Sequence, residues 1–118
     1  MQFETIEELL NYTQSKGLFE PLVKQVIKDF GLVGVTLHIP EPWEVNAFSE
    51  RITEKLYLLI MEQNRKYVNL LYRMDVAEKE LGPYKSDTVE EAKRMTGIVL
   101  NRALRKVQFR ADEGNQHF

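Results

Sequence analysis

The sequence predicts a mainly all-α protein whose core is a long antiparallel helical hairpin. One apolar stripe at helical spacing runs through residues 50 to 81 without an internal glycine or proline. Gly82-Pro83 then end this stripe and leave a five-residue connection to another long helical pattern. With 118 residues, of which 43% are hydrophobic, the chain is expected to form one domain over residues 1–112 and a disordered tail over 113–118.

Two short helices are predicted before the hairpin. The first covers residues 6 to 16, because Thr5 is a favourable N-cap, Glu8 completes a capping box with it, and Gly17 supplies a left-handed stop. The second runs from about Pro21 to Phe30, with proline at its first position and a glycine after its end. Both helices are too short to persist alone, so each is expected to dock on a larger element.

An extended segment is predicted over residues 33–39. Val33, Val35, Leu37 and Ile39 alternate with other residues, which is the period of a strand and not of a helix. The sequence offers no second strand to pair with it, and an unpaired strand exposes its backbone polar groups. We therefore expect Val33, Val35 and Leu37 to lie at an interface where the same segment of a second subunit pairs with this one.

The third helix is predicted to be long, starting between Glu41 and Ser49 and ending at Leu81. At ~1.5 Å per residue it would extend for about 50 Å, which is longer than a domain of this size needs. Its main face is apolar except for one glutamine. The residues on that face are Ile52, Leu56, Leu59, Gln63, Tyr67, Leu70, Met74, Ala77 and Leu81.

A second apolar stripe on the same helix consists of Tyr57, Met61, Val68 and Tyr72. A helix that is apolar on two sides is usually buried on two sides. Either the two short helices cover this stripe within one chain, or it forms the interface of a homo-oligomer. The length of the helix and the unpaired extended segment favour the oligomer, and a dimer in particular.

The last helix is predicted from about Asp87 to Ala111. Asp87 or Thr88 caps it, acidic residues occupy its first turn and basic residues its end, as the helix dipole favours. The short connection makes it the antiparallel neighbour of the long helix.

Composition and motifs narrow the possible chemistry. The chain has no cysteine, which excludes disulfides, thiolate catalysis and sulfur-ligated metals. Its two histidines stand in no helical metal-binding motif, and no serine stands in a nucleophile motif. No metal, cofactor or catalytic residue is expected. The formal charge of −2, the lack of a membrane-length apolar run and the lack of a signal-peptide pattern predict a cytoplasmic protein that does not bind membranes.

Two alternatives involve specific polar residues. Gln63 and Tyr67 lie on the main apolar face and, with Arg102, would form a polar pocket for an anionic ligand or an enzymatic site in the helical core. Arg94, Arg102 and Arg105 share one side of the last helix and would form a phosphate-contacting face for nucleic acid. The acidic remainder of the chain counts against nucleic acid, and no basic-residue pattern typical of an enzyme supports the pocket. We therefore expect a non-enzymatic interaction or scaffold module that acts as a homo-oligomer.

Residues 70 to 78, LLYRMDVAE, lie in the long helix and precede an arginine-rich last helix. This arrangement resembles a group of short, uncharacterised bacterial helical proteins, and the resemblance covers mainly residues 50 to 110. It implies the helical hairpin and a bacterial origin. It implies no activity and assigns no functional residue.

Overall fold

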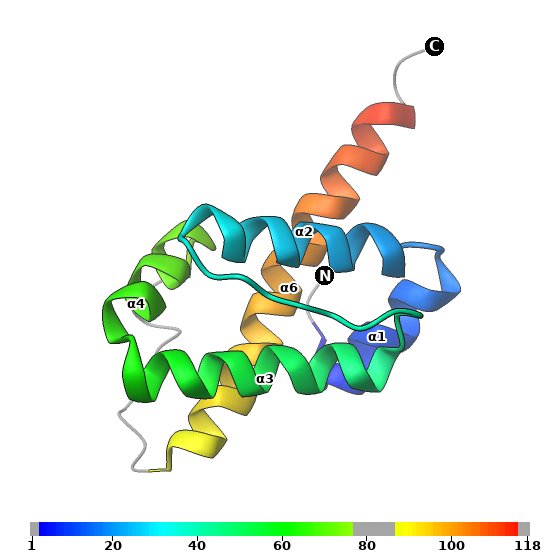
Figure 1. Ribbon diagram of the computed structural model, residues 1–118. Helices are drawn as coiled ribbons and strands as arrows, with labels where there is room; N and C mark the ends of the chain where they lie inside the picture. The colour runs from blue at the N-terminus through cyan, green and yellow to red at the C-terminus, as the bar shows by residue number, and fades with distance from the viewer. Residues whose placement is uncertain (1–2, 77–86, 116–118) are drawn as a thin grey trace.

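The computed structural model describes residues 3–76 and 87–115, with the backbone alone for residues 113–115. Within these ranges the chain is helical and contains no strand (Figure 1). The helices are α1 (Ile6–Ser15), α2 (Phe19–Leu32), α3 (Val45–Glu62), α4 (Asn64–Arg73) and α6 (Thr88–Asn115). The all-α class is therefore confirmed. The predicted helix end at Leu81, the connection at 82–86 and residues 116–118 of the predicted tail lie outside the described residues.

The N-terminal helices lie close to their predicted positions. The hydroxyl of Thr5 caps α1 by accepting a hydrogen bond from the Glu8 amide at 3.1 Å. Gly17 follows α1 with φ +68°, the left-handed conformation expected of it. The second helix is longer than predicted at both ends, because Gly31 stays helical and the left-handed residue is Gly34, at φ +77°.

The prediction of one continuous long helix is wrong. Gln63, at φ −139° and ψ 59°, leaves the helical conformation and separates α3 from α4. The turn still satisfies the backbone, since the Gln63 amide donates to the Leu59 carbonyl and the Gln63 carbonyl accepts from the Tyr67 amide. Figure 1 shows that α4 turns across the end of the molecule toward the end of α2.

Burial explains the break. The buried residues of α4 are Tyr67, Leu70 and Leu71, followed by Met74, and they close one end of the hydrophobic core. Burial of these side chains is favourable, and the turn at Gln63 directs the helix that carries them across the end of the core. The predicted apolar stripe is thus correct for the side chains that the structure describes, except that Gln63 is exposed at the bend.

The extended segment exists, but it begins at residue 35 and not at residue 33, because Val33 and Gly34 form the turn that ends α2. Residues 35–40 run back along α2 and α3, so that these two helices point in the same direction (Figure 1). Val35 and Leu37 are each only 5% exposed within the single chain, and Val33 packs partly buried against the same core. The core of their own chain therefore covers these side chains, and the pairing of the segment with that of a second subunit stays a prediction.

Helix α6 makes its most extensive contacts with α3 and also packs on α2 and α1. Asp87 caps it by accepting hydrogen bonds from the Val89 and Glu90 amides. The helix continues to Asn115, beyond the predicted end at Ala111, so residues 113–115 of the predicted tail are helical. Figure 1 shows α6 crossing obliquely behind α2 and α3, with its C-terminal part extending beyond them. None of the described helices combines the length and apolar character that a membrane span requires.

Candidate anion-binding site

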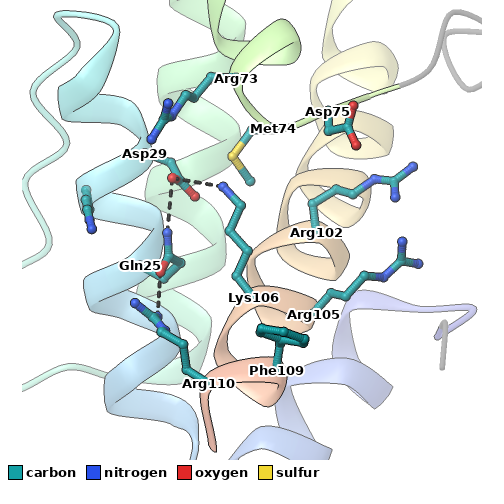
Figure 2. Close-up of a pocket in the computed structure, with 11 residues that line it drawn as sticks. Gln25, Asp29, Arg73, Met74, Asp75, Arg102, Arg105, Lys106, Phe109 and Arg110 are labelled. Carbon is teal, nitrogen blue, oxygen red and sulfur yellow. Dashed lines mark hydrogen bonds and ion pairs between the residues drawn. The ribbon is translucent and has the colours of Figure 1, made fainter. Parts of the chain in front are cut away.

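The main candidate site is a basic groove of about 540 Å³ between three helices (Figure 2). Its lining comes from α2, from α6, and from the end of α4 and the turn after it, so no single stretch of sequence contains it. The charged residues of the basic groove are Lys28, Asp29, Arg73, Asp75, Arg102, Arg105, Lys106 and Arg110. They comprise six cations and two carboxylates, a formal net charge of +4. Because the whole chain carries −2, all other residues together carry −6.

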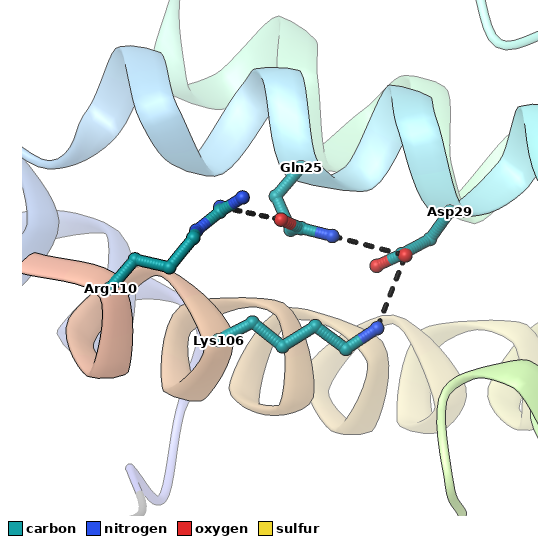
Figure 3. Close-up of polar contacts among 4 residues, drawn as sticks. All are labelled: Gln25, Asp29, Lys106 and Arg110. Carbon is teal, nitrogen blue, oxygen red and sulfur yellow. Dashed lines mark hydrogen bonds and ion pairs between the residues drawn. The ribbon is translucent and has the colours of Figure 1, made fainter. Parts of the chain in front are cut away.

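One side of the basic groove is held by a chain of polar contacts (Figure 3). The Gln25 amide Nε2 donates to Asp29 Oδ1 at 3.0 Å, and Lys106 Nζ lies 3.1 Å from the same oxygen. Arg110 Nη2 donates to Gln25 Oε1 at the other end. This chain fixes one amine and one guanidinium of α6 at defined positions against α2.

Asp29 is the buried residue in this series of polar contacts. Its side chain is only 1% exposed, whereas that of Lys106 is 37% exposed. A buried carboxylate needs a paired cation, and removal of that cation typically costs several kcal/mol. Lys106 therefore supports folding as well as the charge of the groove. The second oxygen, Oδ2, is buried and accepts no hydrogen bond within the described part of the chain.

Three of the cations have no counter-ion in the described chain. The side chains of Lys28, Arg73 and Arg105 make no hydrogen bond or ion pair with any described residue, although all three line the basic groove. In Figure 2, Arg73 reaches from α4 toward α2, while Arg102 and Arg105 extend together in the opposite direction. Like charges gathered around one hollow raise the local positive potential, and a multivalent anion bound there relieves their repulsion.

The structure divides the predicted phosphate-contacting face. Arg102 and Arg105 both line the basic groove, as their shared helix face predicts. Arg94 is separate: its guanidinium pairs with Glu91 at 2.7 Å and lines another hollow, beside Lys93 and Asn101. That hollow also contains Glu90 and Glu4, so cations do not dominate it.

The predicted polar pocket in the helical core is not assembled. Gln63 is exposed and lines a hollow of about 160 Å³ with Lys55 and Lys66. Tyr67 is buried in the hydrophobic core, and Arg102 lies in the basic groove. The bend between α3 and α4 is the physical reason, because it rotates Gln63 away from the face that Tyr67 occupies.

The second apolar stripe is not covered by α1 and α2. Tyr57, Met61, Val68 and Tyr72 are 36%, 58%, 48% and 86% exposed. Of the two alternatives for this stripe, coverage within one chain is therefore wrong for these four side chains. Coverage by a second copy stays a prediction.

The sequence analysis did not predict several of the residues that line the basic groove. Gln25 and Asp29 are one helical turn apart, and Asp29 follows Leu22 and Val26 on the buried face of α2. That spacing is a signal that helical projection would have revealed. Lys28 and Arg73 carry no such signal, because only the packing of α2 and α4 against α6 brings them to the groove.

The chain was compared with models of protein families, with curated proteins and with solved structures, and none of the three comparisons gave a significant match. The resemblance of residues 70 to 78 to short bacterial helical proteins thus stays a prediction. Within residues 3–76 and 87–115, no group of three or more histidine, aspartate and glutamate side chains is arranged to hold a metal ion.

Proposed function

We propose that this protein is a non-enzymatic binding module that takes a phosphate-bearing ligand in the basic groove. The observation that carries the proposal is the net charge of +4 around one hollow, in a chain whose other residues carry −6. Phosphate groups suit such a site because guanidinium groups bind them through paired, charge-assisted hydrogen bonds. The proposed ligand is an intracellular one, in keeping with the cytoplasmic location expected from the sequence.

The groove combines fixed and adaptable cations. Lys106 and Arg110 are held by Asp29 and Gln25, so they lose little freedom when an anion binds. Arg105 is exposed and has no described partner, so its side chain can close on the ligand. This division supports recognition of an extended anion with several charges.

The test is a titration with tripolyphosphate at low salt. Binding is measured by calorimetry and by the melting temperature at each ligand concentration. We expect the melting temperature to rise as ligand is added, because a ligand that binds only the folded state stabilises it. Arg105→Glu should weaken binding about tenfold, since it replaces an attraction of up to ~1 kcal/mol with a similar repulsion.

Lys93→Glu is the matched control, because it makes the same charge change on an exposed residue of α6 outside the groove. This variant should bind tripolyphosphate nearly as well as the unmodified protein. Absence of any stabilisation by tripolyphosphate, or equal losses in the two variants, would overturn the proposal.

Self-association is a second candidate function. The exposure of Tyr57, Met61, Val68 and Tyr72 supports it, since large apolar side chains grouped on two consecutive helices often mark a protein interface. None of these four residues lines the basic groove, so a homodimer formed through their side chains does not require groove residues, although Tyr72 is adjacent to Arg73 of the groove. The two candidate functions are therefore compatible.

A further inference from the structure

Phe109 is an exposed aromatic side chain in the wall of the basic groove. It is 66% exposed although it belongs to the long helix that packs in the middle of the molecule. Arg102, Arg105, Lys106 and Phe109 are spaced i, i+3, i+4 and i+7, so they share one face of α6. Figure 2 shows the ring between Arg105 and Arg110.

A simple polyphosphate would use the cations of this face but not the ring. A ligand that alternates phosphates with flat aromatic groups would use both. Nucleic acids have this composition, and proteins that bind single strands combine basic grooves with aromatic side chains on which bases stack. In a duplex the bases are already stacked on each other, so the flat face of a base is available to Phe109 only in a single strand.

The extent of the cations favours a strand over a single nucleotide. From Arg102 to Arg110, the basic face covers about 12 Å along α6 at ~1.5 Å per residue. Lys28 and Arg73 add charge from α2 and α4, across the groove. Figure 1 also shows that the C-terminal part of α6 extends beyond α2 and α3.

We propose that the phosphate-bearing ligand is a single-stranded nucleic acid, with one base stacked on Phe109 and the adjoining phosphates on Arg105, Lys106 and Arg110. This inference rests on the proposed anion-binding function and specifies its ligand. The recognition is independent of sequence, because every base offers a flat face to the ring.

The test compares two fluorescent probes by anisotropy: an oligodeoxythymidine of about 12 nucleotides and an abasic oligonucleotide of the same length. Both probes carry the same phosphates, but only the first carries bases. Phe109→Ala should weaken binding of the oligodeoxythymidine by about 5- to 150-fold and leave binding of the abasic probe unchanged. Phe109→Trp should restore binding of the oligodeoxythymidine, since tryptophan also offers a ring for stacking.

The outcomes separate this inference from the proposed function. If the protein binds both probes equally, or if Phe109→Ala changes neither, base stacking is overturned while anion binding stands. If thymidine monophosphate binds as tightly as the oligonucleotide, the strand is overturned in favour of a single nucleotide. If neither probe nor tripolyphosphate binds, both the inference and the proposed function are overturned. Phe109 is exposed, so its variants are expected to fold, which circular dichroism will check.

Discussion

Asp75 lowers the positive charge of the basic groove and has an unusual backbone conformation. It follows α4 with φ +59°, a left-handed conformation that glycine usually occupies. The Asp75 amide donates to the Tyr72 carbonyl and the Val76 amide to the Leu71 carbonyl, the two hydrogen bonds of a Schellman motif. A carboxylate at a helix C-terminus also opposes the helix dipole. The left-handed backbone and the helix dipole therefore both make aspartate unfavourable at this position. The attraction of its carboxylate to the cations of the groove acts in the opposite direction.

Replacement of this residue should therefore improve two properties. We expect Asp75→Gly to raise the free energy of unfolding by about 1 kcal/mol, because glycine adopts the left-handed conformation without steric cost. The same change removes a negative charge from the groove and should tighten tripolyphosphate binding severalfold. Denaturant unfolding and calorimetry measure the two effects.

Asp75→Asn is the control that separates charge from conformation. It removes the charge but keeps a side chain, so its gain in affinity should equal that of Asp75→Gly while its gain in stability should be smaller. A loss of stability in both variants would contradict this account, because it would show that the carboxylate stabilises the fold.

At the scale of elements, the extended segment joins two helices that point the same way. Val35, Leu37 and Ile39 face the core, while Thr36 and His38 between them are exposed. Trp43 holds the end of the segment, since its indole Nε1 donates to the Ile39 carbonyl at 3.3 Å. The segment therefore contributes a row of buried side chains to the core, as a strand would, but without a partner strand among the described residues.

Leu37→Ala tests whether these side chains are buried within one chain or between two copies of it. We expect it to lower the free energy of unfolding by about 2–4 kcal/mol, the usual cost of a cavity left by a buried leucine. Thr36→Ala, at the exposed neighbouring position, should change stability by less than about 0.5 kcal/mol. Denaturant unfolding of both variants, with light scattering, measures the effects. A folded Leu37→Ala variant that loses mass but not stability would contradict burial within one chain.

At the scale of the whole molecule, two surfaces have different characters and consist of different residues, although α4 contributes to both. The basic groove gathers charge from α2, α4 and α6, whereas the second apolar stripe follows α3 and α4. The groove suits an anionic ligand, and the stripe suits another apolar surface. A dimer held through the stripe would present two basic grooves, which increases the apparent affinity for a long polyanion.

Self-association predicts a mass of about twice 13.9 kDa by light scattering over a wide range of concentration. The double variant Met61→Glu with Tyr72→Glu should be a folded monomer with a nearly unchanged melting temperature, because both residues are exposed in the single chain. Asn46→Glu adds a negative charge at an exposed position of α3 outside the stripe and should leave the mass unchanged. A monomeric unmodified protein at all concentrations would rule out this role for the stripe.

The local features of this protein were predictable from the sequence. Four such features depend on neighbours in the chain, and the structure contains them: the cap at Thr5, a cap at Asp87 as one of the two candidates, the left-handed Gly17, and the alternation of Val35, Leu37 and Ile39 without the predicted start at Val33. Helical periodicity likewise identified the buried face of α3 and most of that of α4. Such features are predictable because side-chain spacing and backbone hydrogen bonding act over a few residues.

Three features depend on contacts between distant parts of the chain and were not predictable from local patterns. They are the bend at Gln63, the burial of the extended segment within its own chain and the convergence of cations on the groove. No glycine or proline marks the bend in the sequence, and it places the buried side chains of α4 across the end of the core. Lys28, Arg73 and Arg105 are far apart in the sequence, so their shared hollow arises from helix packing alone. The physical reason is the same throughout: burial and charge act between surfaces, and those surfaces meet only in the folded chain.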